Sequence, residues 1–456
     1  MKNFLKIFLL LPTLLFAQKS IYRSVQYNQT AVVWTDGGTR TFTISNDTIY
    51  FSASAPDTMG LGDVVSCDTT ILNLVRNITL FITKRINNTT FIVKRNNGST
   101  PPTLTTRTLW DVDRAYTTMA NIPTGIENTG IGLTFDGSSR NLVTNNETYI
   151  VVCYNGADSI VSAGMNWGSN FVTGASNRLK IITPVTSDEV GKSQRHSGKY
   201  SGYGYKIFRN ASGAGSLITF SNGTSEAEHV EIDGIACKVT GTGGQVAFQV
   251  NDLPADGIII VSNCVMAGSD STSTQTGTVA AIYGFGAASG AVIKVSNTII
   301  YGWKTAASTT NEGGVFTGST FSGTITCNNV TGYKNEVTYA RGAGTMNTNN
   351  CIANRTANGW SGTIGGNYNI SDLSSDAPGA NSKNSTTVSF SSISASNFLL
   401  SANDTAAKNA GTDLSGGDPA VTKGIRGNSR PQGTAFDIGA DELDILSTHR
   451  RSIIIQ

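Results

Sequence analysis

Apolar and polar residues alternate along most of the chain, and between Ile218 and Ile370 the alternation repeatedly ends in asparagine. The pattern is an apolar residue, any residue, an apolar or small residue, any residue, and Asn. It closes at Asn222, Asn263, Asn297, Asn329 and Asn350, with a weaker copy at Tyr368. A period of two residues is typical of a β-strand with one buried face. The pattern therefore predicts a strand that recurs along the chain and is followed each time by the same kind of turn.

The repeated strands predict a solenoid. Successive asparagines lie 41, 34, 32 and 21 residues apart, which fits one coil per repeat with insertions of different length. One coil cannot bury its apolar face alone, whereas stacked coils bury a continuous core. We therefore predict an all-β fold, a right-handed parallel β-helix. An antiparallel β-sandwich also shows alternation, but it does not place asparagine at one phase of every unit.

The recurring asparagines also predict a polar column along the solenoid. Asparagine adopts a left-handed backbone more readily than most residues. Its amide can donate to the next coil and accept from the previous one, as in an asparagine ladder. We expect this ladder to contain Asn222, Asn263, Asn297, Asn329 and Asn350.

The remaining sequence divides into regions around this repeat. Residues 1–17 have the charged, apolar and small-residue parts of a secretory signal peptide. Residues 18–109 alternate without regular asparagines, so we expect either a small β domain or an irregular start of the solenoid. We place the β-helix at 131–400 and a carboxy-terminal cap and tail at 401–456.

A helix is predicted over Trp110–Asn121, within a capping helix and linker at 110–130. Asp111 or Asp113 can cap its amino terminus, and Pro123 ends it. We expect this helix to cover the first coil, where unpaired strand edges would otherwise recruit other chains.

Composition supports an exported β-rich protein. The chain has 456 residues, of which 50 are Gly and only 14% are charged. A net charge of +2, without blocks of like charge, gives no reason to expect nucleic-acid binding. An even count of six cysteines in an exported protein would allow disulfides, but Cys237, Cys264, Cys327 and Cys351 lie within or beside strands, where we expect small buried thiols. The chain has no CxxC motif, so we expect no zinc site. We expect no transmembrane segment after signal cleavage.

The densest polar segment runs from Glu189 to Tyr205 and is rich in glycine. Basic and aromatic side chains on such a loop can hold a sugar by charge-assisted hydrogen bonds and ring stacking. The candidate binding residues are Lys192, Arg195, His196, Tyr200, Tyr203 and Tyr205. The alternative is a solvated excursion from a coil without a ligand.

An acidic cluster follows, of which Glu231 and Asp233 are expected on one outer strand face. With a residue from an adjacent coil they could hold calcium or act as acid and base. The simpler interpretation is a pair of solvated strand residues. No other cofactor is predicted.

Several short motifs resemble a group of secreted right-handed parallel β-helix proteins of unassigned function, which share the pectate-lyase-like solenoid. The motifs are Arg114-Ala115-Tyr116, Asn141-Leu142-Val143, Val152-Cys153-Tyr154, Ile182-Thr183-Pro184-Val185 with Glu189-Val190-Gly191, Ser193-Gln194-Arg195-His196, and the closing pair Arg430-Pro431 and Phe436-Asp437-Ile438-Gly439-Ala440-Asp441-Glu442. The resemblance implies export and this fold, and it implies no particular activity.

Two classes of function remain for such a protein. The first is an adhesin-like surface protein that binds glycans without catalysis, for which an aromatic stripe along one face would be the mark. The second is a secreted polysaccharide lyase or glycoside hydrolase acting on an acidic polysaccharide, which requires carboxylates converging from adjacent coils. A phage tail spike shares the fold, but the predicted signal peptide argues against it.

Overall fold

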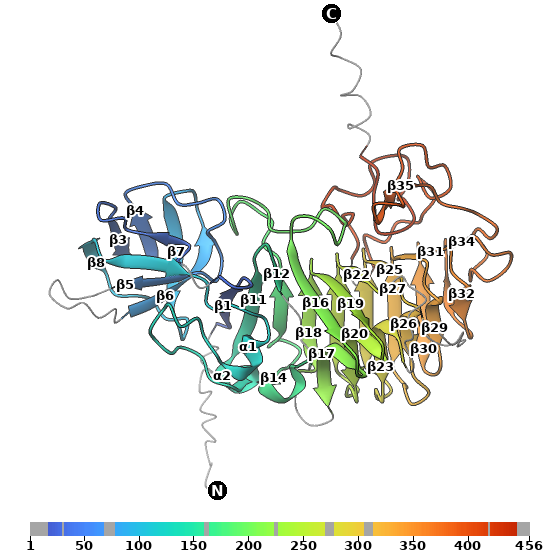
Figure 1. Cartoon of the computed structure of the whole chain (residues 1–456), viewed down its shortest axis with the longest axis horizontal. Helices are drawn as coiled ribbons and strands as arrows, with labels where there is room; N and C mark the ends of the chain where they lie inside the picture. The colour runs from blue at the N-terminus through green and yellow to red at the C-terminus, as the bar shows by residue number, and fades with distance from the viewer. Residues whose placement is uncertain are drawn as a thin grey trace, which may run out of the picture.

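The chain folds as a parallel β-helix with an antiparallel domain at one end and an irregular carboxy-terminal segment on one side (Figure 1). The computed structural model describes residues 17–29, 32–67, 78–158, 164–222, 227–269, 278–304, 313–417 and 420–444. The predicted signal peptide and the last tail residues lie outside these ranges, apart from Ala17. The all-β solenoid predicted from the repeat is confirmed.

Three parallel sheets form the solenoid walls in the described part of the chain. Sheet 1 contains β1 (Lys19–Val25), β11 (Glu147–Cys153), β15 (Leu179–Ile182), β18 (His229–Asp233), β21 (Ile258–Ser262), β24 (Val292–Ser296), β27 (Thr324–Asn328), β30 (Thr345–Asn349) and β33 (Gly365–Asn367). Sheet 2 contains β12 (Gly156–Asp158), β16 (Tyr205–Ala211), β19 (Ala236–Gly241), β22 (Val265–Ala267), β25 (Ile299–Tyr301), β28 (Thr331–Tyr333), β31 (Ile352–Asn354) and β34 (Ile370–Ser371). Sheet 3 contains β13 (Met165–Asn166), β17 (Gly215–Asn222), β20 (Gln245–Asn251), β23 (Ala280–Phe285), β26 (Gly313–Thr317), β29 (Val337–Arg341) and β32 (Asn358–Ser361).

Each coil passes through the three sheets in turn, so the same positions stack from coil to coil. In sheet 1, Ile259 pairs with Ile293, Ile293 with Ile325, and Ile325 with Met346. All four side chains are buried in one apolar cluster that runs the length of the solenoid. The alternation in the sequence thus corresponds to an inward column of apolar residues.

The turn that joins a strand of sheet 1 to the next strand of sheet 2 is here called the first corner. In successive coils, the residue at this corner has a left-handed backbone conformation. Asn263, Asn297, Asn329 and Asn350 have φ angles of 52°, 45°, 55° and 52°. The predicted left-handed asparagines are therefore confirmed at these four positions, and the weaker copy at Tyr368 has φ 54°.

The prediction for Asn222 is wrong. Asn222 ends β17 in sheet 3, where it pairs with Asn251, so it is not part of the corner column. In the coil before Asn263, the residue at the first corner is Gly234, whose φ angle is 84°. An alternating strand of sheet 3 happens to end in asparagine, and the sequence pattern alone does not separate the two sheets.

The amino-terminal region is a separate antiparallel domain inserted after the first strand of the solenoid. Strand β1 belongs to sheet 1 and pairs in parallel with β11. The domain sheet has the order β2 (Trp34–Thr35), β9 (Trp110–Asp113), β5 (Val64–Cys67), β6 (Ile78–Arg85), β7 (Thr90–Arg95), β4 (Thr48–Phe51), β3 (Phe42–Ser45) and β8 (Leu104–Arg107). The predicted region 18–109 therefore combines a solenoid strand with a small β domain.

The helix predicted over Trp110–Asn121 is wrong. Trp110–Asp113 form strand β9, which pairs with β2 and β5. The Trp110 ring packs at 4.8 Å from Trp34 and 5.0 Å from Phe51, so aromatic burial outweighs the helical spacing. The described helices are short: α1 (Asn121–Thr124), α2 (Leu142–Asn145) and the 3₁₀ turn η1 (Gly168–Asn170). Near α2, the two-residue strands β10 (Arg140–Asn141) and β14 (Phe171–Val172) pair in parallel.

The carboxy-terminal segment does more than close the last coil. Ala377 joins the main core, and Asp376 accepts hydrogen bonds from Gly359 and Trp360, so the residues after β34 cover the end of the solenoid. The chain then returns along the outer face of sheet 2, where β35 (Phe390–Ser392) and β36 (Asn397–Leu400) form an antiparallel pair. The Phe398 ring lies 4.7 Å from Tyr301 and 4.5 Å from Tyr333.

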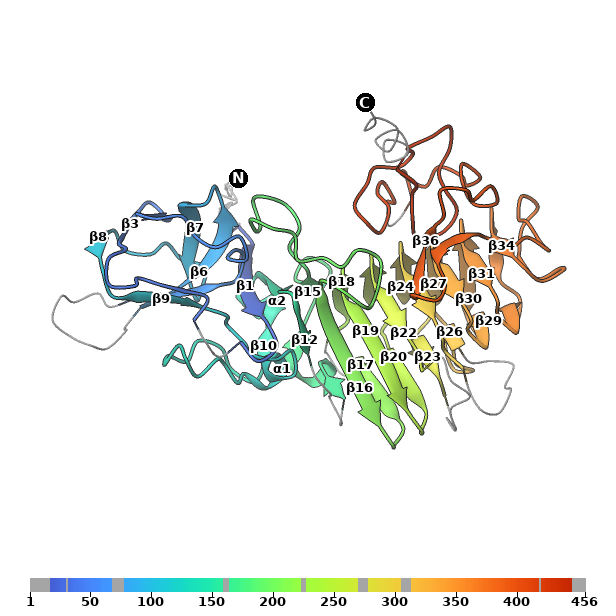
Figure 2. The same ribbon diagram turned by 45° about the horizontal axis from the view of Figure 1, so that its top comes forward.

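Two predicted boundaries are therefore corrected. The last described solenoid strand, β34, ends at Ser371 rather than near residue 400. The cap predicted at 401–456 lies along the side of the solenoid as far as its last described residue, Asp444 (Figure 2). Apolar residues on both faces of β25 explain this, because Ile300 faces the core while Ile299 and Tyr301 face the returning segment.

All six cysteines are buried and free, which agrees with the expectation for Cys237, Cys264, Cys327 and Cys351. Burial raises the pKa of the Cys264 thiol to about 12. In the described residues, no helix combines the length and the hydrophobicity that crossing a lipid bilayer requires.

A buried ionic cluster joins the amino-terminal domain to the first coils. Asp136 accepts hydrogen bonds from Arg23 Nε at 2.7 Å, Arg140 Nη1 at 2.8 Å, and the hydroxyls of Tyr116 and Tyr149 at 2.9 and 2.8 Å. Burial alone raises the pKa of Asp136, but Arg23 and Arg140 more than offset it, so its pKa lies below the ordinary value. The carboxylate is thus held in its charged form.

We predict that Asp136→Asn destabilises the protein by about 3–5 kcal/mol at neutral pH, because Arg23 stays buried without its counter-ion. A lowered carboxylate pKa stabilises the fold above its unfolded-state pKa, and this stability is lost as pH falls through the folded-state pKa. The variant should therefore lose less stability than the wild type when pH is lowered through this range. Urea unfolding at several pH values measures both effects.

The matched control is Asp256→Asn, because Asp256 is exposed. It should change the unfolding free energy by less than about 0.5 kcal/mol. Equal stability of the two variants at neutral pH would contradict the role of the cluster.

Candidate functional site

A polar cleft lies over the first corner, between the β15–β16 loop and the returning carboxy-terminal segment. The loop and the segment stand on the same side of the solenoid (Figures 1 and 2). We call it the corner cleft; its volume is about 280 Å³. Its floor consists of Glu231, Ile260, Ser262, Asn263, Ser296 and Asn297. Its walls consist of Arg195 on one side and Ala420, Thr422, Lys423, Gly424 and Gly427 on the other.

The strand register explains which side chains reach the floor. Residues of sheet 1 alternate between the core and the outside, and Glu231 pairs with Ile260 while Asp233 pairs with Ser262 and Ser262 with Ser296. These are the outward positions of three adjacent coils. The floor is therefore a small array of side chains on a rigid sheet.

The structure brings the predicted basic and acidic candidates together. Arg195 forms an ion pair with Asp233, and its Nε donates to Thr183 Oγ1 at 3.2 Å. Asp233 also accepts from Ser262 Oγ at 2.9 Å and from the Asn263 amide. The sequence proposed two separate sites, whereas the folded chain has one polar cluster.

Glu231 and Asp233 do share an outer face, as predicted, but each faces a cation. Lys180 Nζ lies 2.7 Å from Glu231 Oε2, one coil away. A calcium site needs oxygen ligands that converge on a shared space, and here the carboxylates are engaged by Lys180 and Arg195. The described residues contain no group of three or more His, Cys, Asp or Glu side chains that could hold a metal ion.

The other predicted binding residues are dispersed. Lys192 and Tyr203 line a second cleft on the opposite side of the same loop. Tyr200 is half-buried and packs on the cluster beneath the carboxy-terminal segment. Tyr205 is fully buried and belongs to the main core.

His196 is also buried rather than presented to a ligand. Its Nδ1 accepts from the Gly198 amide at 3.1 Å. Burial, together with the nearby Arg195 charge, lowers the pKa of His196 to about 4. The imidazole is therefore neutral at physiological pH and supplies no charge to a bound sugar.

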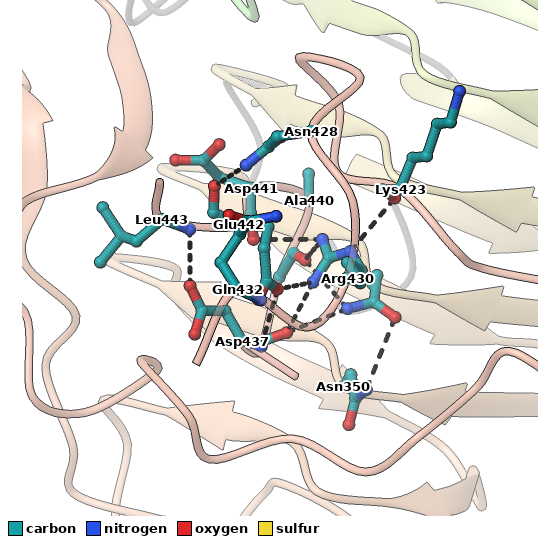
Figure 3. Close-up of polar contacts among 12 residues, drawn as sticks. Asn350, Lys423, Asn428, Arg430, Gln432, Asp437, Ala440, Asp441, Glu442 and Leu443 are labelled. Atoms are coloured by element: carbon teal, nitrogen blue, oxygen red, sulfur yellow. Dashed lines mark hydrogen bonds and ion pairs between the residues drawn. The ribbon is translucent and has the colours of Figure 1, made fainter. Parts of the chain in front are cut away.

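A buried arginine, Arg430, ties the second wall of the corner cleft to the closing motif (Figure 3). The Arg430 side chain is completely buried. Its guanidinium donates to backbone carbonyls of Lys423, Asp437, Gly439 and Asp441 at 2.8–3.1 Å. These bonds tie the cleft residue Lys423 to the loop at 437–442.

The carboxylates of the closing motif complete this network. Glu442 accepts from Arg430 Nη1 at 2.9 Å and from the amides of Gln432 and Asp437 at 2.8 and 3.0 Å. Asp441 accepts from the Leu400 amide and from Arg426. Burial raises the pKa of Glu442 and lowers that of Arg430, which indicates that the desolvation of this pair outweighs its attraction.

The corner asparagines bind this segment more than they bind one another. Asn297 Nδ2 donates to Lys423 O at 2.7 Å, and Asn329 Nδ2 donates to the carbonyls of Asp437 and Gly439, both at 3.1 Å. Asn350 exchanges bonds with Thr412 in both directions, at 2.8 and 2.9 Å. The one amide-to-amide bond between described corner asparagines, from Asn350 to Asn329, is long at 3.5 Å.

The predicted ladder is thus mainly a docking column for the carboxy-terminal segment. Asn263 differs, because its amide donates to Asp233 in the preceding coil. The side chain of Asn222 lies outside the described part of the chain.

Sequence reasoning missed most of the residues that make the cleft. Thr422 and Lys423 lie in a Gly-rich stretch without periodicity, so nothing local connects them to β21 and β24. Ser262 and Ser296 carried a usable signal, because each directly precedes a corner asparagine. Comparison of the sequence with family models, curated proteins and solved structures gave no match.

We predict that Arg430→Lys destabilises the protein by about 3 kcal/mol and increases hydrogen exchange in residues 420–443. A lysine keeps the charge but cannot reproduce the fork of donors that reaches the carbonyls. Hydrogen exchange with mass spectrometry, together with urea unfolding, measures the change.

The matched control is Arg426→Lys. Arg426 makes a partly exposed ion pair with Asp441, so the same substitution there should cost about 1 kcal/mol or less. If both variants leave the exchange of 420–443 unchanged, Arg430 does not hold the wall.

Proposed function

We propose that this protein is an exported, adhesin-like β-helix protein that binds glycans at the cell surface or outside the cell without catalysis. The observation that carries the proposal is the corner cleft, a fixed concave surface of hydroxyl, amide and paired charged groups. Export rests on the predicted signal peptide and on the resemblance to secreted β-helix proteins.

The cleft chemistry suits a sugar better than an apolar ligand. Ser296 and Thr422 offer hydroxyls to a ligand, and the Ser262 hydroxyl, whose proton is donated to Asp233, can still accept a hydrogen bond. Glu231 and Asp233 are neutralised by Lys180 and Arg195, so these charges orient a polar ligand without repelling it. The volume of about 280 Å³ lies just below the range of roughly 300–1,000 Å³ for small-molecule sites, which suits a short part of a longer chain.

A second observation favours binding over catalysis. On the outer face of sheet 3, Tyr283 stacks on Phe316 with 5.2 Å between ring centroids and 9° between planes. Phe285 lies 5.9 Å from Tyr283 and is 38% exposed. Phe316 itself is buried, so Tyr283 and Phe285 are the rings open to a ligand. They form a short aromatic patch of the kind expected on a glycan-binding face, since flat rings pack against sugar rings.

The test is the migration of the purified chain through native gels that each contain one polysaccharide, stained afterwards for polysaccharide loss. We predict retardation by at least one polysaccharide that stays intact. Ser262→Leu should weaken this binding tenfold or more, because it fills the cleft floor and removes a hydroxyl.

Asn349→Leu is the matched control. Asn349 occupies the same outer column outside the cleft, and its amide likewise bonds to the preceding coil, at 3.3 Å to Asn328. It should retain wild-type binding within twofold. Equal retardation of both variants would exclude the corner cleft, and a cleared zone would overturn the non-catalytic proposal and direct substitution to Glu231 and Asp233.

A further inference from the structure

A second cleft of about 280 Å³ lies between the amino-terminal domain and the β15–β16 loop. We call it the junction cleft. The solenoid side contributes Asn155, Lys192, Gln194 and Tyr203, and the other side includes Gln26, Thr58 and Arg114. The inference drawn from it rests on the proposed function and assigns a ligand class.

The described lining of the junction cleft contains two cations and no carboxylate. Arg114 is already neutralised, because it forms a buried ion pair with Asp63, and it stacks 3.5 Å above the Tyr154 ring. Lys192 makes no ion pair with a described residue, and its Nζ lies 4.9 Å from the Tyr203 ring centroid. The uncompensated charge of the cleft is therefore the Lys192 ammonium group.

Asp57, which contacts Lys192 through the backbone, does not neutralise its ammonium group. The Lys192 amide donates to the Asp57 carbonyl at 2.9 Å, but the Asp57 carboxylate faces Arg85 at 3.9 Å. A carboxylate entering the cleft would thus meet an ammonium group whose charge is available.

Amide side chains hold Lys192 and Tyr203 in position. Gln194 Oε1 accepts from the backbone N–H of Asn155 at 3.1 Å, while its Nε2 donates to the backbone carbonyl of Lys192 at 2.6 Å. Asn155 Oδ1 in turn accepts from the Gly204 amide at 2.8 Å, next to Tyr203. The cation and the ring are therefore presented from an anchored loop.

The two clefts lie along the same corner of the solenoid. Asn155 follows β11 and Asn263 follows β21, and these strands are three steps apart in sheet 1. At 4.7–4.9 Å per strand the two positions are roughly 14 Å apart. The β15–β16 loop separates them, with Lys192 and Tyr203 on one side and Arg195 on the other.

We propose that the junction cleft binds a uronate residue of the polysaccharide that occupies the corner cleft. The ammonium group of Lys192 pairs with the uronate carboxylate, and the Tyr203 ring packs on the sugar face. The ligand class of the protein is then a linear acidic polysaccharide that occupies both clefts and crosses the β15–β16 loop between them.

The test compares polygalacturonate with its methyl-esterified form, which has the same backbone without the charge. The wild type should bind polygalacturonate at least tenfold more tightly. Lys192→Gln should remove this difference and leave binding of the ester within twofold. Lys199→Gln, on the same loop but outside the cleft lining, is the matched control and should behave as the wild type.

The outcomes separate this inference from the proposed function. The uronate assignment is overturned if Lys192→Gln and Lys199→Gln behave equally. It is also overturned if the wild type binds both polymers with equal affinity, and in both cases the proposal of glycan binding stands. Absence of retardation by every polysaccharide overturns the proposed function and the polymer path together.

A third arm tests the junction cleft alone, by calorimetry with galacturonate oligomers on Ser262→Leu, in which the corner cleft is filled. Binding that disappears when Lys192→Gln is added supports the assignment. If acetate displaces the oligomer as effectively as galacturonate does, the cleft is a simple anion site and the sugar assignment is wrong.

Discussion

The left-handed first corner is the constraint on which the rest of this structure depends. A left-handed residue costs roughly 1–2 kcal/mol for most side chains, and glycine and asparagine avoid much of that cost. In this chain the choice of asparagine has a second effect, because Asn297, Asn329 and Asn350 also bind the returning segment. One residue type therefore sets the turn of the coil and fixes what lies beside it.

The binding of the returning segment to the first corner explains the closing motif, Arg430-Pro431 with residues 436–442. Arg430 binds the carbonyls of the loop at 437–442, whose Ile438 and Ala440 pack in the apolar cluster beside sheet 2, and Glu442 accepts from the amides around it. The result is a wall that stands beside sheet 1 and turns an open solenoid surface into a concave one. The motif therefore shapes the surface of strands that lie far from it in the sequence.

The sequence predicts correctly those features that arise from local, repeated patterns. It fails for features that arise from contacts between distant parts of the chain. The inward column and the corner asparagines follow from alternation and backbone preference, so they were predictable. Trp110 was assigned to a helix because spacing cannot show that Trp34 and Phe51 will surround it. Lys192 and Arg195 are predicted together as binding residues of one loop, and no local signal shows that they face different clefts.

The position of β1 has a consequence for how the chain folds. Lys19 pairs with Glu147 and Val25 with Cys153, although the whole antiparallel domain lies between them in sequence. During synthesis the first strand emerges before its partner exists, so the inserted domain can form while β1 waits unpaired. Such long-range parallel pairing is slow. The solenoid therefore begins to assemble only after its second strand has emerged, and the insertion delays nucleation at the amino-terminal end.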